Sequence, residues 1–134
     1  TTFALDPDVA IVVDVTHATD APNVDKRQEG DHGLGAGAVL NAGSIVHPRV
    51  LDLLRETAAE HGIPVSFEAT PRLSGTDGDA VHLSRRGVPT GIVSVPLRYM
   101  HSPVEIVQLS DVDACARLIA AFAQRLSAET SFVR

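Results

Sequence analysis

The chain has 134 residues, of which 44% are hydrophobic and 21% charged, a composition typical of one globular domain that buries roughly two thirds of its unfolded surface. Its formal net charge is -6 and its basic residues are scattered, which argues against a phosphate-binding face for nucleic acid. The longest strongly apolar stretch, residues 115–123, contains Arg117 and is shorter than the ~18 residues of a membrane span, so we expect neither nucleic acid nor a membrane as a partner.

Cysteine content and the first residues bear on the compartment. No basic start followed by an apolar block precedes Lys26, so we expect no secretory signal. Cys115 is the only cysteine, which excludes a disulfide within the chain and favours a reducing compartment. We therefore expect a cytoplasmic protein.

The predicted elements begin with a strand over residues 9–15, a continuous β-branched run typical of a central strand covered on both faces. Residues 17–37 show no periodicity and are rich in Gly and Asp, which predicts a long exposed loop, and such loops are usually functional. A short strand is expected at residues 38–40. A helix then starts at Pro48 and ends before Gly62.

The second half of the chain continues the alternation of strands and helices. A strand is expected at residues 65–69, followed by a short helix with polar caps at residues 77–87. Another strand is expected at residues 90–95 and an irregular segment at residues 97–104. Ser110 and Asp113 are predicted to form a capping box for an amphipathic helix that ends near Ser127. This alternation indicates an α/β protein, a layered α/β/α sandwich around a central, mostly parallel or mixed sheet.

Two familiar kinds of site are excluded by their context. Residues 33–38 match the spacing G-x-G-x-x-A, but no predicted strand precedes the glycines and no helix follows them, so a dinucleotide site is rejected. A serine hydrolase of the G-x-S-x-G type is also unsupported, because no serine lies in that motif.

Three polar residues lie beyond a predicted strand or at a helix start: Asp14, Asp77 and His101. Asp14 ends an apolar strand, where a buried carboxylate needs a cation or several donors; the alternative is a turn or cap aspartate. His101 is either a metal ligand or an ordinary surface or core histidine. Asp77 is most simply a helix cap. Four further histidines lack mutual ligand spacing and are expected to be solvated: His32, His47, His61 and His82. His17 lies close to Asp14 in sequence, but the two do not make a metal site by themselves.

Four motifs, in order along nearly the whole chain, resemble those of a known family. They are residues 9–16 with 20–22, residues 75–77, residues 87–90, and residues 98–105, which begin Arg-Tyr-Met-His-Ser-Pro. The family is that of the glutamyl and tetrahedral aminopeptidases, dinuclear metallopeptidases often labelled endoglucanase or cellulase M. The segment containing Arg-Tyr-x-His-Ser-Pro is the most specific part of the resemblance.

The resemblance implies a metal-dependent aminopeptidase that removes N-terminal residues from peptides. It implies that Asp14 binds one metal and His101 the other, and that Asp77 borders the active-site cleft. The Glu105 carboxylate would orient the imidazole ring of His101 without binding the metal itself, as metal-bound imidazoles commonly require. The complete enzyme would use two divalent ions, zinc or cobalt, act on peptide substrates and form a homo-oligomer.

The chain also departs from the family pattern. An adjacent Glu-Glu pair, which supplies the general base and a ligand, is absent, and the bridging aspartate and a further histidine are also unmatched. The family pattern places the base upstream, so we expect residues 1–134 to be the C-terminal portion of the catalytic domain, an incomplete sandwich without a catalytic residue of its own. It should be inactive alone and hold metal poorly or not at all.

Two other functional interpretations remain. The first is a non-catalytic remnant of the same fold, used for assembly or regulation. A sugar-cleaving enzyme is the second, but it needs a carboxylate pair flanking a glycosidic bond, and no such constellation is evident.

If the metal-site assignment is right, the Asp14 carboxylate and the His101 imidazole should approach within roughly 8 Å at one edge of the sheet.

Overall fold

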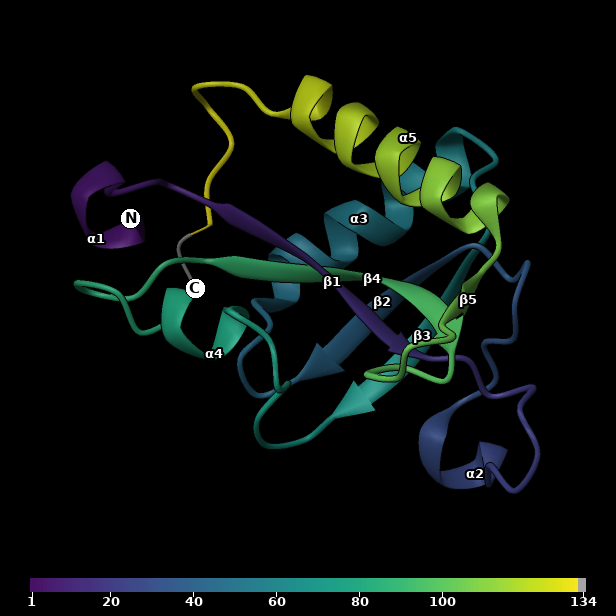
Figure 1. Ribbon diagram of the computed structural model, residues 1–134. Coiled ribbons are helices and arrows are strands. Elements are labelled where there is room, and N and C mark those ends of the chain that lie inside the picture. Colours follow the sequence, from purple (N-terminus) through teal and green to yellow (C-terminus); the bar gives the residue numbers. More distant parts are fainter. Residues whose placement is uncertain (133–134) are drawn as a thin grey trace.

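Five strands form one mixed sheet in the computed structural model, which describes residues 1–132 (Figure 1). The strands are β1 (Ala10–His17), β2 (Ala38–Gly43), β3 (Val65–Thr70), β4 (Thr90–Arg98) and β5 (Ile106–Val107). Their order is β1-β4-β2-β3, and β5 pairs with β4. β1 is parallel to β4 and β2 is parallel to β3, whereas β2 and β4 are antiparallel and share two register pairs. The mixed sheet expected from the sequence is confirmed.

β1 differs from the prediction in its position and in its length. Among the described residues it pairs with β4 alone, so the expectation of a central strand is wrong for this chain. Val13, in the middle of the strand, is 54% exposed. The strand also continues past the predicted end, because pairing with β4 extends to His17 opposite Leu97. Asp14 therefore lies within the strand rather than at its end.

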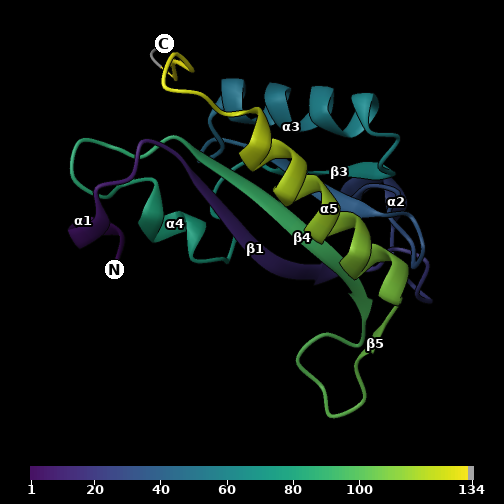
Figure 2. The ribbon, with the colours of Figure 1, turned by 90° about the horizontal axis from the view of Figure 1, so that it is seen from above.

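Helices occupy both faces of the sheet. They are α1 (Thr2–Leu5), α2 (Lys26–Glu29), α3 (Pro48–Glu60), α4 (Gly78–Val81) and α5 (Leu109–Arg125). Pro48 is at the start of α3, as predicted, where its missing N–H has no helical partner to lose. In Figure 1, α5 lies above the strands and α4 below them, and Figure 2 shows α3 and α5 side by side. The layered α/β/α arrangement is confirmed.

The main core lies between the sheet and the pair α3 and α5. Leu40 and Val93 from the sheet pack with Leu54 of α3 and with Leu118 and Phe122 of α5, and all five are almost completely buried. Each such side chain contributes about 1.5–3 kcal/mol through the removal of its apolar surface from water. This face therefore supplies most of the hydrophobic stabilisation.

The opposite face carries a smaller apolar cluster and several polar side chains. Ile92 packs with Ile45 and Val12, and a Cβ placed on the first residue of α4 would meet Ile92 at 3.0 Å. Side chains alternate along a strand, so Ser94, two residues beyond Ile92, lies on this same face. Asp14 is paired with Ser94 in the β1–β4 register and shares the face.

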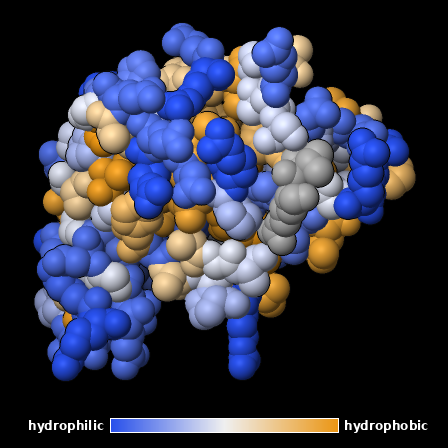
Figure 3. All heavy atoms as spheres, turned by 180° about the vertical axis from the view of Figure 1, so that it is seen from behind, coloured by the Kyte–Doolittle hydropathy of each residue, from blue (hydrophilic) through white to orange (hydrophobic). Residues whose placement is uncertain are grey.

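Three helix boundaries or loops differ from the prediction. α5 begins directly after Gln108 without a side-chain cap, so the capping box of Ser110 and Asp113 is wrong. α4 ends at Val81, six residues before Gly87, and the predicted loop over residues 17–37 contains α2. The surface around α2 is hydrophilic (Figure 3). None of the helices in residues 1–132 is long and apolar enough to cross a membrane.

Candidate functional site

Asp14 occupies the middle of β1, opposite Ser94 of β4. It is half-buried, and its Oδ1 accepts a hydrogen bond from the backbone N–H of Val15 at 2.8 Å. Since the residue is in a strand, the alternative of a turn or cap aspartate does not hold. A carboxylate in an otherwise apolar segment of β1, on the face opposite the main core, remains chemically available as an oxygen ligand.

His101 lies in the loop between β4 and β5, residues 99–105, and is exposed. Its φ angle is 63°, and that of Tyr99 is 61°, so two non-glycine residues of this short loop are left-handed. The backbone N–H of His101 donates to Glu105 Oε1 at 2.6 Å. Glu105 thus contacts the backbone of His101, whereas the resemblance predicts an action on its ring.

The topology brings Asp14 and His101 to neighbouring strands. β1 and β4 are parallel, and the His101 loop leaves the carboxyl end of β4. Asp14 is level with Ser94, four residues before Arg98, which corresponds to about 13 Å along the strand. The expected approach of the two side chains to roughly 8 Å therefore requires the His101 loop to fold back along β4 toward Asp14, and it stays a prediction.

Asp14 and His101 have the donor atoms of a zinc site but do not complete one. Zinc sites use three or four protein ligands, and within residues 1–132 no group of three or more His, Cys, Asp or Glu side chains could hold a metal ion. The described residues do not by themselves fit a metal centre. They supply two candidate ligands.

Asp77 precedes α4, but it is exposed and makes no side-chain cap. Thr76 Oγ1 accepts the N–H of the first residue of α4 at 3.1 Å instead. The carboxylate of Asp79 organises the turn by accepting from Ser74 N–H at 2.8 Å and from Gly75 N–H at 3.0 Å. These hydrogen bonds lower the pKa of Asp79 below its usual value. Asp77 therefore occupies the predicted N-cap position of α4, but its side chain does not cap the helix.

An ion pair between Asp20 and Arg98, not anticipated from the sequence, joins the ends of β1 and β4. Arg98 donates from Nε to Asp20 Oδ1 at 3.0 Å and from Nη2 to Oδ2 at 2.6 Å. Asp20 Oδ2 also accepts from the backbone N–H of Leu34 at 3.3 Å. The hydrogen bond from Arg98 is the main cause of the lowered pKa of Asp20. One carboxylate thus connects three chain segments.

Asp111 is a second carboxylate that sequence reasoning missed. It is 1% exposed and accepts the backbone N–H groups of Gly35 and Gly37 at 2.8 and 2.9 Å. One turn later, burial and the charge of Asp111 raise the pKa of Cys115 to about 11. Asp111, Cys115 and Leu118 share the apolar face of the last helix in sequence, and a carboxylate there needs partners. This spacing is the signal in the sequence from which a buried, hydrogen-bonded Asp111 could have been predicted.

A row of polar side chains crosses three strands on the face opposite the main core. Ser94 of β4 donates from Oγ to Asn41 Oδ1 of β2 at 2.9 Å, and Asn41 Nδ2 donates to Glu68 Oε2 of β3 at 3.2 Å. Ser94 and Asn41 are almost completely buried, so each hydrogen bond replaces one to water. The row leads directly to the strand position of Asp14.

The four histidines that were expected to be solvated are not all exposed. His61 is exposed, as expected. His32, in contrast, is 1% exposed, and its backbone N–H donates to Thr19 Oγ1 at 2.9 Å. His47 and His82 are half-buried. The expectation of a solvated ring is wrong for His32, because its segment folds against the buried Thr19.

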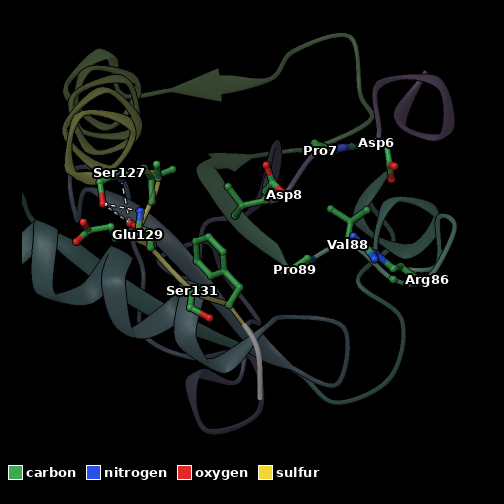
Figure 4. Close-up of a pocket in the computed structure, with 15 residues that line it drawn as sticks. Asp6, Pro7, Asp8, Arg86, Val88, Pro89, Ser127, Glu129 and Ser131 are labelled. Atoms are coloured by element: carbon green, nitrogen blue, oxygen red, sulfur yellow. Dashed lines mark hydrogen bonds between the residues drawn. The ribbon is translucent and has the colours of Figure 1, made fainter.

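A hollow of about 920 Å³ lies at the other end of the sheet from His101 and the Asp20–Arg98 pair. Its walls are the segments before β1 and β4 and the chain after α5 (Figure 4). Asp6, Asp8 and Glu129 are its acidic groups and Arg86 its basic one. It therefore lies at the amino ends of β1 and β4, whereas His101 and the Asp20–Arg98 pair lie at their carboxyl ends.

Comparison with known proteins gives the family. Residues 1–118 match the sequence profile of the M42 glutamyl aminopeptidases. Lysyl aminopeptidase of Pyrococcus furiosus is 37% identical over 129 residues, which are 92% of this chain and 35% of that protein.

Solved structures agree with this match. A TET aminopeptidase from the marine sediment archaeon Thaumarchaeota archaeon SCGC AB-539-E09 superposes with a TM-score of 0.88 at 28% identity, over 96% of this chain and 36% of that one. PhTET1-12s, solved as a dodecamer, gives a TM-score of 0.72 at 28% identity, over 93% and 37% of the two chains. The chain thus spans about a third of the length of these relatives. It belongs to the M42 glutamyl aminopeptidase family.

Proposed function

We propose that this chain supplies two ligands to a dinuclear metallo-aminopeptidase centre, Asp14 to one metal ion and His101 to the other. The observation that supports this most directly is the in-register parallel pairing of β1 with β4. That pairing sets a lone carboxylate of an apolar strand beside the strand that leads into the His101 loop. The centre acts on the N-terminal residue of peptide substrates.

The remaining parts of the centre lie outside this chain. Hydrolysis at paired metal ions also needs a bridging ligand and a carboxylate base. The sequence has no Glu-Glu pair to provide the base, and the bridging aspartate of the family pattern is also unmatched. We infer that residues 1–134 form the C-terminal portion of the catalytic domain and are inactive alone. Zinc or cobalt is the expected metal in the complete enzyme.

The neighbouring residues take supporting roles. Asp77, exposed at the turn before α4, borders the substrate cleft, and Glu105 holds the backbone of His101. The complete enzyme is a cytoplasmic homo-oligomer. The dodecameric PhTET1-12s supports an assembly of several copies.

A chimera tests the proposal. The matching segment of the Pyrococcus furiosus lysyl aminopeptidase is replaced by this chain, and turnover of an aminoacyl reporter is measured with zinc, cobalt or manganese. We expect an active chimera in which Asp14→Asn and His101→Gln each lower kcat/KM by about a thousandfold or more, because removal of a metal ligand disturbs the charge stabilisation of the reaction.

The control is Asp31→Asn, which removes an exposed partner of Lys26 and should leave kcat/KM unchanged. Wild-type turnover in the Asp14→Asn chimera would contradict the ligand assignment. Turnover by the purified 134-residue chain alone would contradict the claim that its centre is incomplete. A folded chimera without activity, equally inactive in all variants, would favour a non-catalytic remnant.

A further inference from the structure

We propose that Asp20 is a positioning residue: through Arg98 it holds the loop of residues 99–105 in the conformation that presents His101. The role of the presented ring rests on the proposed function, but the positioning itself is a property of this chain. It is supported by the conformation of the loop, by the anchoring of Asp20 and by the geometry of the ion pair.

The loop adopts a conformation that needs external support. Tyr99 and His101 have φ angles of 61° and 63°, and a left-handed conformation costs a non-glycine residue about 1–2 kcal/mol. Such conformations persist when surrounding contacts over-determine them. Within the loop, Ser102 N–H donates to the carbonyl of Tyr99 at 3.1 Å, and His101 N–H donates to Glu105. Val104 N–H donates to Ser102 Oγ at 3.3 Å, and the pairing of Arg98 with Ile106 joins the two ends of the loop. The side chain of Arg98, the residue directly before the loop, adds a fixed point outside these local contacts through its ion pair with Asp20.

Asp20 is well placed to fix Arg98 because its own backbone is anchored. Ala18 N–H donates to the Leu97 carbonyl at 2.8 Å, which continues the β1–β4 pairing by one residue. The Thr19 N–H donates to the carbonyl of His32 at 3.1 Å, and both Ala18 and Thr19 are buried. Asp20 therefore projects from a rigid segment rather than from a mobile loop.

The contact between Asp20 and Arg98 is bidentate, which fixes direction as well as distance. Two parallel N–H to oxygen bonds restrict the rotation of the guanidinium group, unlike a single point contact. A Cβ on Gly33 would approach Asp20 Cβ to 3.0 Å, so the turn after α2 closes over the carboxylate from the other side. Asp20 thereby couples the loop that follows β1 to the loop that carries His101.

The experiment uses the metal-free 134-residue chain and compares Asp20→Asn and Arg98→Lys with the wild type. Amide hydrogen exchange and ¹⁵N relaxation are read at His101 and across β1 and β4. We expect exchange at His101 to rise by about tenfold in Asp20→Asn, the size expected for a lost hydrogen bond to a charged group. Arg98→Lys should also raise the exchange rate at His101, because the ammonium group keeps the positive charge but lacks the two parallel N–H donors of the guanidinium group.

The double variant separates positioning from general destabilisation. If the two side chains act through one interaction, Asp20→Asn/Arg98→Lys should exchange no faster at His101 than the single variants. Asp31→Asn, which removes the exposed partner of Lys26 in the same loop, is the matched control and should match the wild type. Exchange at His101 within twofold of the control in Asp20→Asn, or an equal rise at all strand amides, would overturn the proposal.

The result is independent of the metal chemistry. Faster exchange confined to residues 99–105, together with an inactive chimera, would leave the positioning role intact and reject the proposed function. An active chimera in which Asp20→Asn leaves both exchange at His101 and kcat unchanged would do the reverse.

Discussion

The two faces of the sheet differ in the side chains that they bury. Toward α3 and α5, Leu40, Val93 and Leu118 are completely buried among other apolar side chains. On the opposite face, Ser94 and Asn41 are just as deeply buried, but they are polar and hydrogen-bonded across three strands. The first face gains free energy from excluded apolar surface. The second gains little of that kind, and it holds polar groups at fixed positions beside Asp14.

The comparison indicates where the chain can tolerate change. A buried apolar side chain can be replaced by another of similar volume at modest cost. A buried amide such as that of Asn41 tolerates replacement only if its partners change with it. The four tests below probe the two faces, from the largest expected effect to the smallest.

Truncation on the apolar face should have the largest effect. Phe122→Ala leaves a cavity between α5 and the sheet and should reduce the free energy of unfolding by about 3–5 kcal/mol, measured by urea denaturation. Val112→Ala is the matched control on the same helix, since Val112 is 42% exposed; we expect a change under about 1 kcal/mol. Equal effects of the two substitutions would show that α5 does not cover the sheet in this way.

The thiol of Cys115 reports on the same apolar face. Burial first, and the charge of Asp111 second, raise its pKa from 9.0 to about 11, so the reactive thiolate should be about a hundredfold scarcer than for a free cysteine. Labelling by a chromogenic disulfide at pH 8 should be slower by at least that factor in the native chain and normal in urea. Rapid native labelling would mean that this part of the core opens readily.

The polar face is tested through Asn41. Asn41→Ala removes the partners of Ser94 and Glu68 together and should destabilise the chain by about 1–3 kcal/mol. Asn41→Leu combined with Ser94→Ala replaces two partners by apolar groups, and it should cost less than the sum of the single changes. Strict additivity in thermal or urea unfolding would refute a coupled row across the sheet.

The smallest expected effect is the loss of stability in acid from the Asp20–Arg98 ion pair, which lies at the carboxyl ends of β1 and β4. The pKa of Asp20 is lowered below 3.8 in the folded chain, so its ionised form stabilises the fold above the unfolded pKa, and this contribution is lost as the pH falls through the folded pKa. The stability difference between wild type and Asp20→Asn should be constant above about pH 5 and vanish at lower pH. A difference that grows on acidification would reverse the sign of this linkage.

Much of the fold was predictable because its signals are local. Proline at the start of α3, the apolar periodicity of α5 and the β-branched run of β1 each specify an element through its own residues. The neighbours of β1 could not be obtained in this way, because a continuous apolar run does not specify which strands lie alongside. The run also suggests that both faces exclude water, whereas Val13 in β1 is 54% exposed. The capping box failed because the chain passes directly from β5 through Gln108 into α5.

The candidate site was less accessible to local reasoning. Asp14 and His101 emerge from a resemblance of motifs, and spacing alone leaves both open. The Asp20–Arg98 pair joins residues 78 positions apart, and the contact of Asp111 with Gly35 spans 76 positions. Contacts of this kind are set by tertiary packing, which no short window of sequence contains.

The parallel pairing of β1 with β4 also has a consequence for the order in which the chain folds. Ala10 pairs with Thr90, so an intervening stretch of about 80 residues must be looped before the first bond between these strands can form. The unit β2-α3-β3 closes over a much shorter separation, and contacts of low sequence separation form early. We therefore expect β1 to dock late, so that an incompletely folded chain has its hydrophobic core but lacks Asp14 in place.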